Sequence, residues 1–292
     1  MVSFKRILLL IFAVLLLAAC GNELIPIDRP PPPAISEKAY FQGITYVRDV
    51  RAEPRPMVIH VMSIDLTAPG IEFLVTPADF DDEYQFAARR TSTFLEEYDL
   101  QVAINGDYFY PFFEFAYPQE GDGVNISGYA VSRGELLTED ASPRSHTLFI
   151  SEDNRAWMGR RDEPDAFNAV SGNVRLLDAG EYAQEGQEEQ FMIDVEPRTG
   201  VAVSEDGETL LLFVVDGRQP GYSEGASMRE LAAIMLAFGG YDGMNLDGGG
   251  SSTMVIEAGD GQPQVMNSPI HTRIPGRERP VANHLGVYAL SR

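Results

Sequence analysis

Four short polar clusters, each next to an apolar run, contain residue types that could bind an anion and carry out acid–base or nucleophilic chemistry. They are Asn-Gly-Asp at 105–107, Arg-Thr at 198–199, Asp-Gly-Arg at 216–218 and Asn-Leu-Asp-Gly-Gly-Gly-Ser-Ser at 245–252. Polar groups at the ends of central strands are held rigidly and can converge on one crevice. A single Asp-Gly pair is usually only a turn, but four such clusters in one chain favour a site.

The run of three glycines in the last cluster indicates anion binding. Successive glycine amides can form a concave nest for an anion, and glycine lets a ligand approach the backbone without a Cβ clash. Two hydroxyl donors follow directly. This interpretation assigns anion binding to Gly248, Gly249, Gly250, Ser251 and Ser252.

Arginines and carboxylates in the same clusters would complete the chemistry. Arg198 and Arg218 could supply the bidentate charge that a phosphate or phosphodiester requires. Asp216 and Asp247 could act as acid–base or nucleophilic groups at an acetal carbon. The combination predicts a ligand that is part phosphate and part sugar. Motifs for zincins, serine hydrolases, Walker loops and dinucleotide sites are missing from the sequence.

The sequence resembles the phosphodiester glycosidase family from about residue 100 to the C-terminus. The matching segments are NGDYF, AVSGNVRLLDAG, PRTGVAVSEDGETLLLFVVDGR, MRELAAIMLAFGGYDGMNLDGGGSSTMVI, NSP and RERPVANHLGVYAL. The resemblance implies hydrolysis of a sugar-1-phosphodiester at the glycosidic carbon, with release of free sugar and a phosphate monoester. For a bacterial member it implies a substrate among cell-envelope or extracellular glycans, in carbohydrate or exopolysaccharide metabolism.

The resemblance also implies the site residues. The catalytic candidates are Asp247, Asp216, Arg218 and Arg198. The implied substrate- and phosphate-binding residues are Asn105, Asn245, Gly248, Gly249, Gly250, Ser251, Ser252, Glu278, Arg279 and Asn283. Asp247 would act as nucleophile or activate water, while Asp216 would orient Arg218 or hold a metal.

Two other functions remain open at this level. One is a non-catalytic module that binds sugar phosphates or anionic polysaccharide. The other is a metal-assisted phosphodiesterase that cuts the P–O bond, for which Asp107, Asp216 and Asp247 could supply oxygen ligands to a divalent cation. For the glycosidase no cofactor is established as a requirement, and a divalent cation remains an open alternative. The presence of every polar motif residue favours an enzyme.

The N-terminal segment has the pattern of a bacterial lipoprotein leader. Residues 1–19 combine two basic residues, a short apolar run and small residues before Cys20, the one cysteine of the chain. We therefore predict a signal peptide at 1–19 and lipid attachment at Cys20. Residues 20–35 would form a proline-rich tether, so that the exported protein is anchored to the cell membrane.

Composition and charge set the remaining expectations. A formal net charge of −22 would repel nucleic acid, so no nucleic-acid partner is expected, and an anionic substrate would need local cations. We expect an α+β fold over residues 36–292, a single β-rich domain with a mixed sheet core flanked by a few helices. Its clearest elements are a hairpin with strands at 199–204 and 209–215, a helix capped by Ser227 and Glu230, and a short helix with a capping box at Thr93 and Glu96.

Overall fold

The computed structural model describes residues 35–292 except 81–82, 113–116, 139–145, 161–164 and 184–189. By its contacts the chain divides into Met1–Pro32 and Pro33–Arg292. The expected signal peptide, the lipid attachment at Cys20 and nearly all of the tether lie outside the described residues. No helix in the described part of the chain has the length and apolar character needed to cross a membrane.

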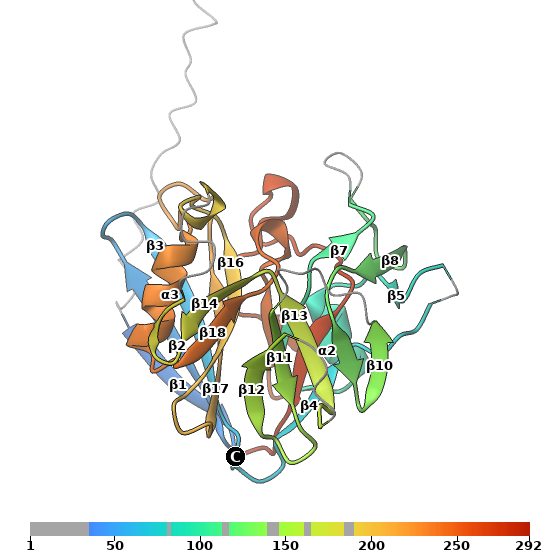
Figure 1. Cartoon of the computed structure of the whole chain (residues 1–292). Helices are drawn as coiled ribbons and strands as arrows, with labels where there is room; N and C mark the ends of the chain where they lie inside the picture. The colour runs from blue at the N-terminus through green and yellow to red at the C-terminus, as the bar shows by residue number, and fades with distance from the viewer. Residues whose placement is uncertain (1–34, 81–82, 113–116, 139–145, 161–164, 184–189) are drawn as a thin grey trace, which may run out of the picture. The chain divides into compact units, whose positions relative to one another are not determined.

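The largest sheet has eight strands, in the order β1-β2-β3-β17-β16-β18-β14-β15 (Figure 1). Its strands are β1 (Ile35–Phe41), β2 (Ile44–Arg51), β3 (Met57–Asp65), β17 (Thr209–Val215), β16 (Arg198–Val203), β18 (Asp242–Asn245), β14 (Val174–Asp178) and β15 (Glu181–Tyr182). The predicted hairpin is confirmed as β16 and β17, with Arg198 opposite Val215.

Three smaller sheets complete the β structure. The first has the order β20 (Pro263–Val265), β19 (Met254–Glu257), β6 (Val102–Asn105), β21 (His284–Tyr288) and β4 (Glu72–Val75). The second has the order β10 (Glu135–Thr138), β9 (Ala130–Ser132), β13 (Asn168–Gly172), β11 (His146–Ile150) and β12 (Ala156–Gly159). The third has the order β5 (Phe86–Ala87), β8 (Gly123–Ile126) and β7 (Phe109–Tyr110).

The β-rich character is confirmed, but the expectation of a mixed sheet is wrong for the described residues. Every pairing between the named strands of the described residues is antiparallel. Parallel neighbours need long crossover connections, which are usually helices. The described residues contain only two α-helices, so short antiparallel connections dominate.

Alternation along β17 shows why both faces of the large sheet are buried. Leu210 and Leu212 belong to a central cluster that the large sheet shares with the two five-stranded sheets. Leu211 and Phe213 point to the opposite face and pack in the cluster beneath α3 (Met228–Ala237). Successive side chains in a strand face opposite sides, so a continuous apolar run fits a strand that is covered on both faces.

The two helices cover the outer faces of different sheets. In Figure 1, α3 lies against the large sheet beside β14, β16 and β18. Ser227 and Glu230 form the capping box that the sequence predicted for this helix. The other helix, α2 (Thr91–Glu97), packs Phe94 and Leu95 against the five-stranded sheet that contains β6.

The capping box expected at Thr93 in α2 is wrong, because the N-cap lies three residues earlier than expected. Its N-cap is Arg90, which makes no side-chain cap. Instead, the backbone amide of Ser92 donates to the carboxylate of Glu278 at 3.0 Å, and the Ser92 hydroxyl donates to the same carboxylate at 2.6 Å. A residue distant in sequence therefore satisfies a free amide at the helix start.

Antiparallel pairing brings three of the predicted polar clusters to the same end of the central strands of the large sheet. Because β16 runs opposite to β17 and β18, its first residue Arg198 lies at the end of the sheet where the other two strands finish. Asp216 directly follows β17, and Asn245 is the last residue of β18. The polar residues at the ends of these strands therefore lie close together, as the sequence predicted.

Candidate active site

The Asn105 side chain links the strand ends of two sheets. Its carbonyl oxygen accepts from the Thr199 hydroxyl on β16 at 2.8 Å and from the Thr253 amide at 3.1 Å. Its amide nitrogen donates to the backbone oxygen of Asp247 at 2.7 Å. Asn105 is 1% exposed. It therefore supports the Asp247 turn and does not line the cavity beside it, so the structure does not place it at the surface expected to bind substrate.

A cavity of about 850 Å³ opens above this turn. The predicted site residues that line it are Arg198, Arg218, Asp247, Gly248, Gly249, Gly250 and Arg279. Its apolar wall consists of Tyr108, Phe109, Phe112 and Tyr117. Charged groups on one side and aromatic rings on another suit a ligand with an anionic part and a sugar ring.

Asp247 is one of two carboxylates that line the cavity, beside Glu196, and it is nearly buried at 9% exposure. The amide of Gly248 donates to its carboxylate at 2.9 Å. Burial raises the pKa of Asp247 from 3.8 to about 6, while the Ser251 hydrogen bond and the charges of Arg279 and Arg218 oppose that rise. The carboxylate is therefore ionised at neutral pH but can take up a proton within a physiological range.

The three glycines allow close approach of protein groups rather than forming the expected anion nest. A Cβ on Gly248 would lie 2.8 Å from the Pro197 carbonyl oxygen, and one on Gly250 would lie 2.5 Å from the Arg279 guanidinium. Gly249 has a φ of +63° and lies under the Arg218 guanidinium.

The amides of the glycine turn are largely used within the protein. The Gly249 amide donates to the Pro197 oxygen at 2.8 Å, the Ser251 amide donates to the Gly248 oxygen at 3.2 Å, and the Gly248 amide donates to Asp247. These three amides are therefore not available to an anion. The glycine run instead lets two guanidinium groups lie against the backbone.

Arg279 is held on several sides. Its Nη1 donates to the Ser251 hydroxyl and its Nε donates to His271 Nδ1, both at 3.2 Å. The guanidinium carbon lies 5.0 Å from the Phe112 ring centroid and 4.9 Å from that of Tyr117. Burial and the neighbouring arginines lower the pKa of His271 to about 4, so His271 is neutral and accepts the hydrogen bond.

The other two predicted arginines are also anchored. Arg198 donates from Nε to the Ala226 oxygen at 2.9 Å and from Nη2 to the Asp194 oxygen. Arg218 has a φ of +58° and pairs with the carboxylate of Glu196. Glu196 thus orients Arg218, which is the role that the sequence analysis had considered for Asp216.

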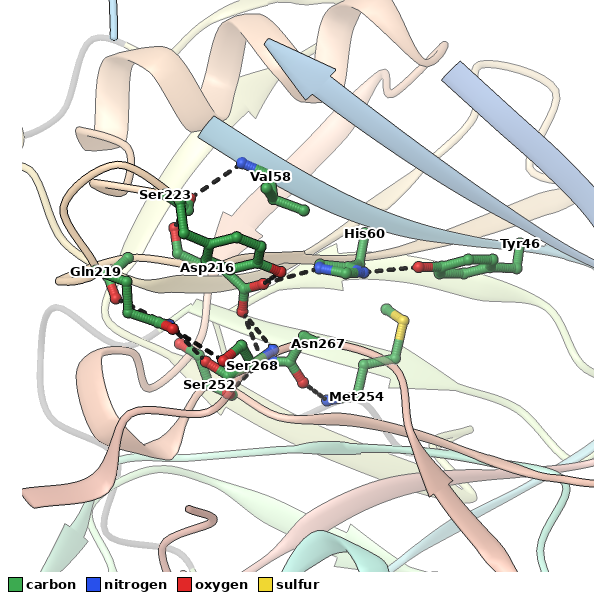
Figure 2. Close-up of polar contacts among 12 residues, drawn as sticks. Tyr46, Val58, His60, Asp216, Gln219, Ser223, Ser252, Met254, Asn267 and Ser268 are labelled. Carbon is green, nitrogen blue, oxygen red and sulfur yellow. Dashed lines mark hydrogen bonds and ion pairs between the residues drawn. The ribbon is translucent and has the colours of Figure 1, made fainter. Parts of the chain in front are cut away.

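Asp216 does not line the cavity, so its predicted catalytic position is wrong. Figure 2 shows its carboxylate at the centre of a buried network. One oxygen accepts from Tyr222 at 2.9 Å and is paired with His60 at 3.0 Å, and the other accepts from Asn267 at 3.0 Å and the Ser268 amide at 2.9 Å. Burial acts to raise the pKa of Asp216, but His60 and these donors lower it below 3.8.

His60 extends the Asp216 network away from the cavity, where Tyr46 bonds its Nδ1 at 2.7 Å. The Asp216 network braces two segments that reach the cavity. Arg218 follows Asp216 by two residues, and Ser268 precedes the cavity-lining residue Ile270. The Ser268 hydroxyl donates to Gln219 at 2.9 Å, which joins the segments directly.

Several other predicted binding residues are buried and do not line the cavity. Asn245 donates to the Tyr108 hydroxyl at 3.1 Å. Ser251 and Ser252 are 1% exposed, and Ser251 supports Arg279. Glu278 holds the start of α2, as described above. Asn245, Ser251 and Glu278 therefore use polar groups in tertiary contacts. The Ser252 hydroxyl, in contrast, is buried without a hydrogen-bond partner among the described residues.

Asn283 is likewise occupied by a buried partner, Asp107. Its amide donates to the Asp107 carboxylate at 2.9 Å, and its carbonyl oxygen accepts from the Asp107 amide at 2.8 Å. Burial raises the pKa of Asp107 to about 8. Among the residues that the structure describes, no group of three or more His, Cys, Asp or Glu side chains could hold a metal. The suggested trio of Asp107, Asp216 and Asp247 is therefore not such a group.

The sequence analysis missed Tyr108, Glu196 and Arg273 as cavity-lining residues. Two of them had a local signal. Tyr108 directly follows the Asn-Gly-Asp cluster, and Glu196 precedes Arg198 by two residues. Arg273 lies in a segment that matched no quoted motif, so only the fold reveals it.

Comparison with known proteins places these features in a family context. A model of the phosphodiester glycosidase family matches residues 98–288. A search of curated protein sequences found no significant match.

Solved structures share the fold. The catalytic domain of zebrafish N-acetylglucosamine-1-phosphodiester alpha-N-acetylglucosaminidase, auto-inhibited by its pro-peptide, is similar with a TM-score of 0.61 and 22% identity, over 91% of this chain and 86% of that one. A hypothetical protein from Synechocystis has a TM-score of 0.60 and 15% identity, over 90% and 64% of the two chains. A putative exported protein from Burkholderia pseudomallei has a TM-score of 0.57 and 16% identity, over 82% and 75%.

The two buried carboxylates give opposite predictions for stability. Asp216→Asn would replace an acceptor oxygen by an amide that faces donors, and would lower the free energy of unfolding by about 3–5 kcal/mol. Asp247→Asn removes a charge that burial disfavours, so the variant should be at least as stable as the parent at pH 8. Denaturant unfolding of the three proteins measures both effects. Equal destabilisation by the two substitutions would contradict the different roles assigned to Asp216 and Asp247.

Proposed function

Because the chain belongs to the phosphodiester glycosidase family, we propose that it hydrolyses the glycosidic bond of a sugar-1-phosphodiester. The observation that carries the proposal is the Asp247 carboxylate in a cavity that Arg198, Arg218 and Arg279 also line. This arrangement supports the resemblance seen in the sequence. The products would be a free sugar and a phosphate monoester.

The arginines suit the leaving group. Cleavage between the anomeric carbon and its oxygen leaves the bonding electron pair on the phosphate oxygen, where negative charge develops. Arg218 and Arg279 lie over Gly249 and Gly250, next to Asp247. Fixed guanidinium groups would stabilise that charge without solvent reorganisation. A phosphate monoester with this support leaves without a strong general acid.

Asp247 would act on the sugar side of the bond. As an ionised carboxylate it either accepts a proton from the water that attacks the anomeric carbon, or attacks that carbon itself and expels the phosphate monoester. In the second case water then hydrolyses the glycosyl ester, which releases the free sugar and regenerates the carboxylate. The hydrogen bond from the Gly248 amide to its carboxylate and the hydrogen bond from the Asn105 side chain to its backbone oxygen hold Asp247 in position. The rings of Phe112 and Tyr117, which also contact Arg279, would provide a surface for the sugar.

We further propose that the substrate is a cell-envelope or extracellular glycan and that the protein is a membrane-anchored lipoprotein. The leader pattern and Cys20 in the sequence support this location. The zebrafish enzyme is named for an N-acetylglucosamine-1-phosphodiester. We extend only the sugar-1-phosphodiester class to this chain.

The first prediction concerns which bond breaks. In ¹⁸O-labelled water, the parent should release free reducing sugar from a sugar-1-phosphodiester, with the label in the sugar. Asp247→Asn should lose at least about a hundredfold in kcat, because removal of a general base or nucleophile costs this much. Label in the phosphate would instead support P–O cleavage. Diester binding without turnover by the parent would support a binding module.

A second prediction concerns pH. Because burial raises the pKa of Asp247 to about 6 and the ionised form is the reactive one, kcat/KM should be constant above that pH and fall below it. Arg279→Gln removes a charge that lowers this pKa, so its acid limb should move to higher pH. An acid limb that stays in place in Arg279→Gln would contradict the role of Asp247.

A third prediction concerns location. Expressed in a bacterium, the parent should incorporate labelled fatty acid and sediment with membranes, because lipid attaches to the Cys20 thiol. Cys20→Ala should incorporate none. Fatty-acid labelling that persists in Cys20→Ala would refute Cys20 as the site of lipid attachment. Turnover by the domain without its N-terminal segment should be the same as that of the parent.

A further inference from the structure

The cavity holds more positive charge than one phosphodiester neutralises. Four arginines line it, and its acidic lining residues among those described are Glu196 and Asp247. Glu196 is already paired with Arg218. The whole chain has a formal net charge of −22, so this local excess of cations is a specific feature. A phosphodiester carries a single negative charge and leaves part of the excess unmatched.

Of the four cavity arginines, Arg273 is the one without a side-chain partner among the residues that the structure describes. Arg198, Arg218 and Arg279 each donate to acceptors in the protein. The Arg273 side chain makes no hydrogen bond or ion pair with any residue that the structure describes, and it is exposed. Its guanidinium can therefore bind a ligand without first giving up an internal contact.

Several hydrogen bonds fix the backbone conformation of the segment that carries Arg273. Thr272 and Arg273 are both left-handed, with φ values of +52° and +61°, which is costly for residues other than glycine. The Arg273 amide donates to the Ile270 oxygen at 3.0 Å, and Arg277 donates to the Thr272 hydroxyl at 3.0 Å. The Asp216 network holds Ser268 at the base of this segment (Figure 2).

We propose that Arg273 binds a second anionic group of the substrate, beyond the phosphodiester that is cleaved. The preferred substrate is then a polyanionic glycan, in which a neighbouring unit carries another phosphate or a carboxylate. This inference rests on the proposed function for the identity of the cleaved bond. It assigns Arg273 to substrate selection and not to the chemical step.

The test compares matched sugar-1-phosphodiesters whose aglycone is neutral, carries a second phosphate or carries a carboxylate. Arg273→Asn removes the charge, and asparagine tolerates the left-handed conformation. The variant should raise KM about tenfold for one or both charged substrates, which is about 1.4 kcal/mol. KM for the neutral substrate and kcat should not change. The two charged arms show whether phosphate or carboxylate is recognised.

Two controls isolate the site. Arg273→Lys retains a positive charge and should recover part of the affinity for the charged substrates. Arg155→Asn removes an exposed arginine that lies outside the cavity and pairs with Asp165 at 3.7 Å. It should leave every KM unchanged. Equal KM changes for neutral and charged substrates, or an Arg155→Asn effect as large as that of Arg273→Asn, would overturn the inference.

Failure of the proposed function can be recognised separately. If the parent turns over none of the substrates, calorimetry with glucose 1-phosphate and glucose 1,6-bisphosphate still tests Arg273. The parent should bind the bisphosphate more tightly, and Arg273→Asn should lose that preference. Equal affinity of the parent for both ligands would overturn the inference without reference to hydrolysis.

Discussion

The buried amide of Asn105 is the interaction on which the site geometry depends. It joins β16 of the large sheet, through Thr199, to the segment that enters β19, through Thr253, and it holds the backbone of Asp247. A primary amide offers acceptors and donors on one small group, so the buried Asn105 side chain can satisfy three partners at once. Without it, each partner would be left unpaired in a low-dielectric interior. The Asp247 turn is thus positioned by the junction of two sheets.

The same interior gives two aspartates opposite properties. Asp216 is surrounded by donors and by His60, and it stays ionised as a structural hub. Asp247 has fewer donors and faces the cavity, and its pKa rises to about 6. Burial is common to both, and the number and kind of neighbours decide the outcome. A carboxylate whose pKa lies near the working pH can exchange a proton during a reaction, while one kept ionised by several hydrogen-bond donors is suited to a structural role.

Local signals in the sequence predicted the elements that depend on local interactions. The hairpin of β16 and β17 and the Ser227 cap of α3 follow from alternation and from a short capping motif. The convergence of polar strand ends and the cavity positions of Asp247 and Arg279 were also predicted. The role of Asp216 was not, because it is decided by His60, which lies 156 residues away in the sequence. The start of α2 depends in the same way on Glu278, 186 residues from Ser92.

The position of β21 has a consequence for how this domain folds. The strand lies between β6 and β4, so the five-stranded sheet has no continuous ladder until residues 284–288 are available. Glu278 and Asn283, just before that strand, hold α2 and Asp107. Contacts of such long sequence separation form late and make folding slow. The five-stranded sheet, and with it the supports of the cavity at Asn105 and Glu278, can therefore reach its final arrangement only after β21 has been made and has paired with β6 and β4.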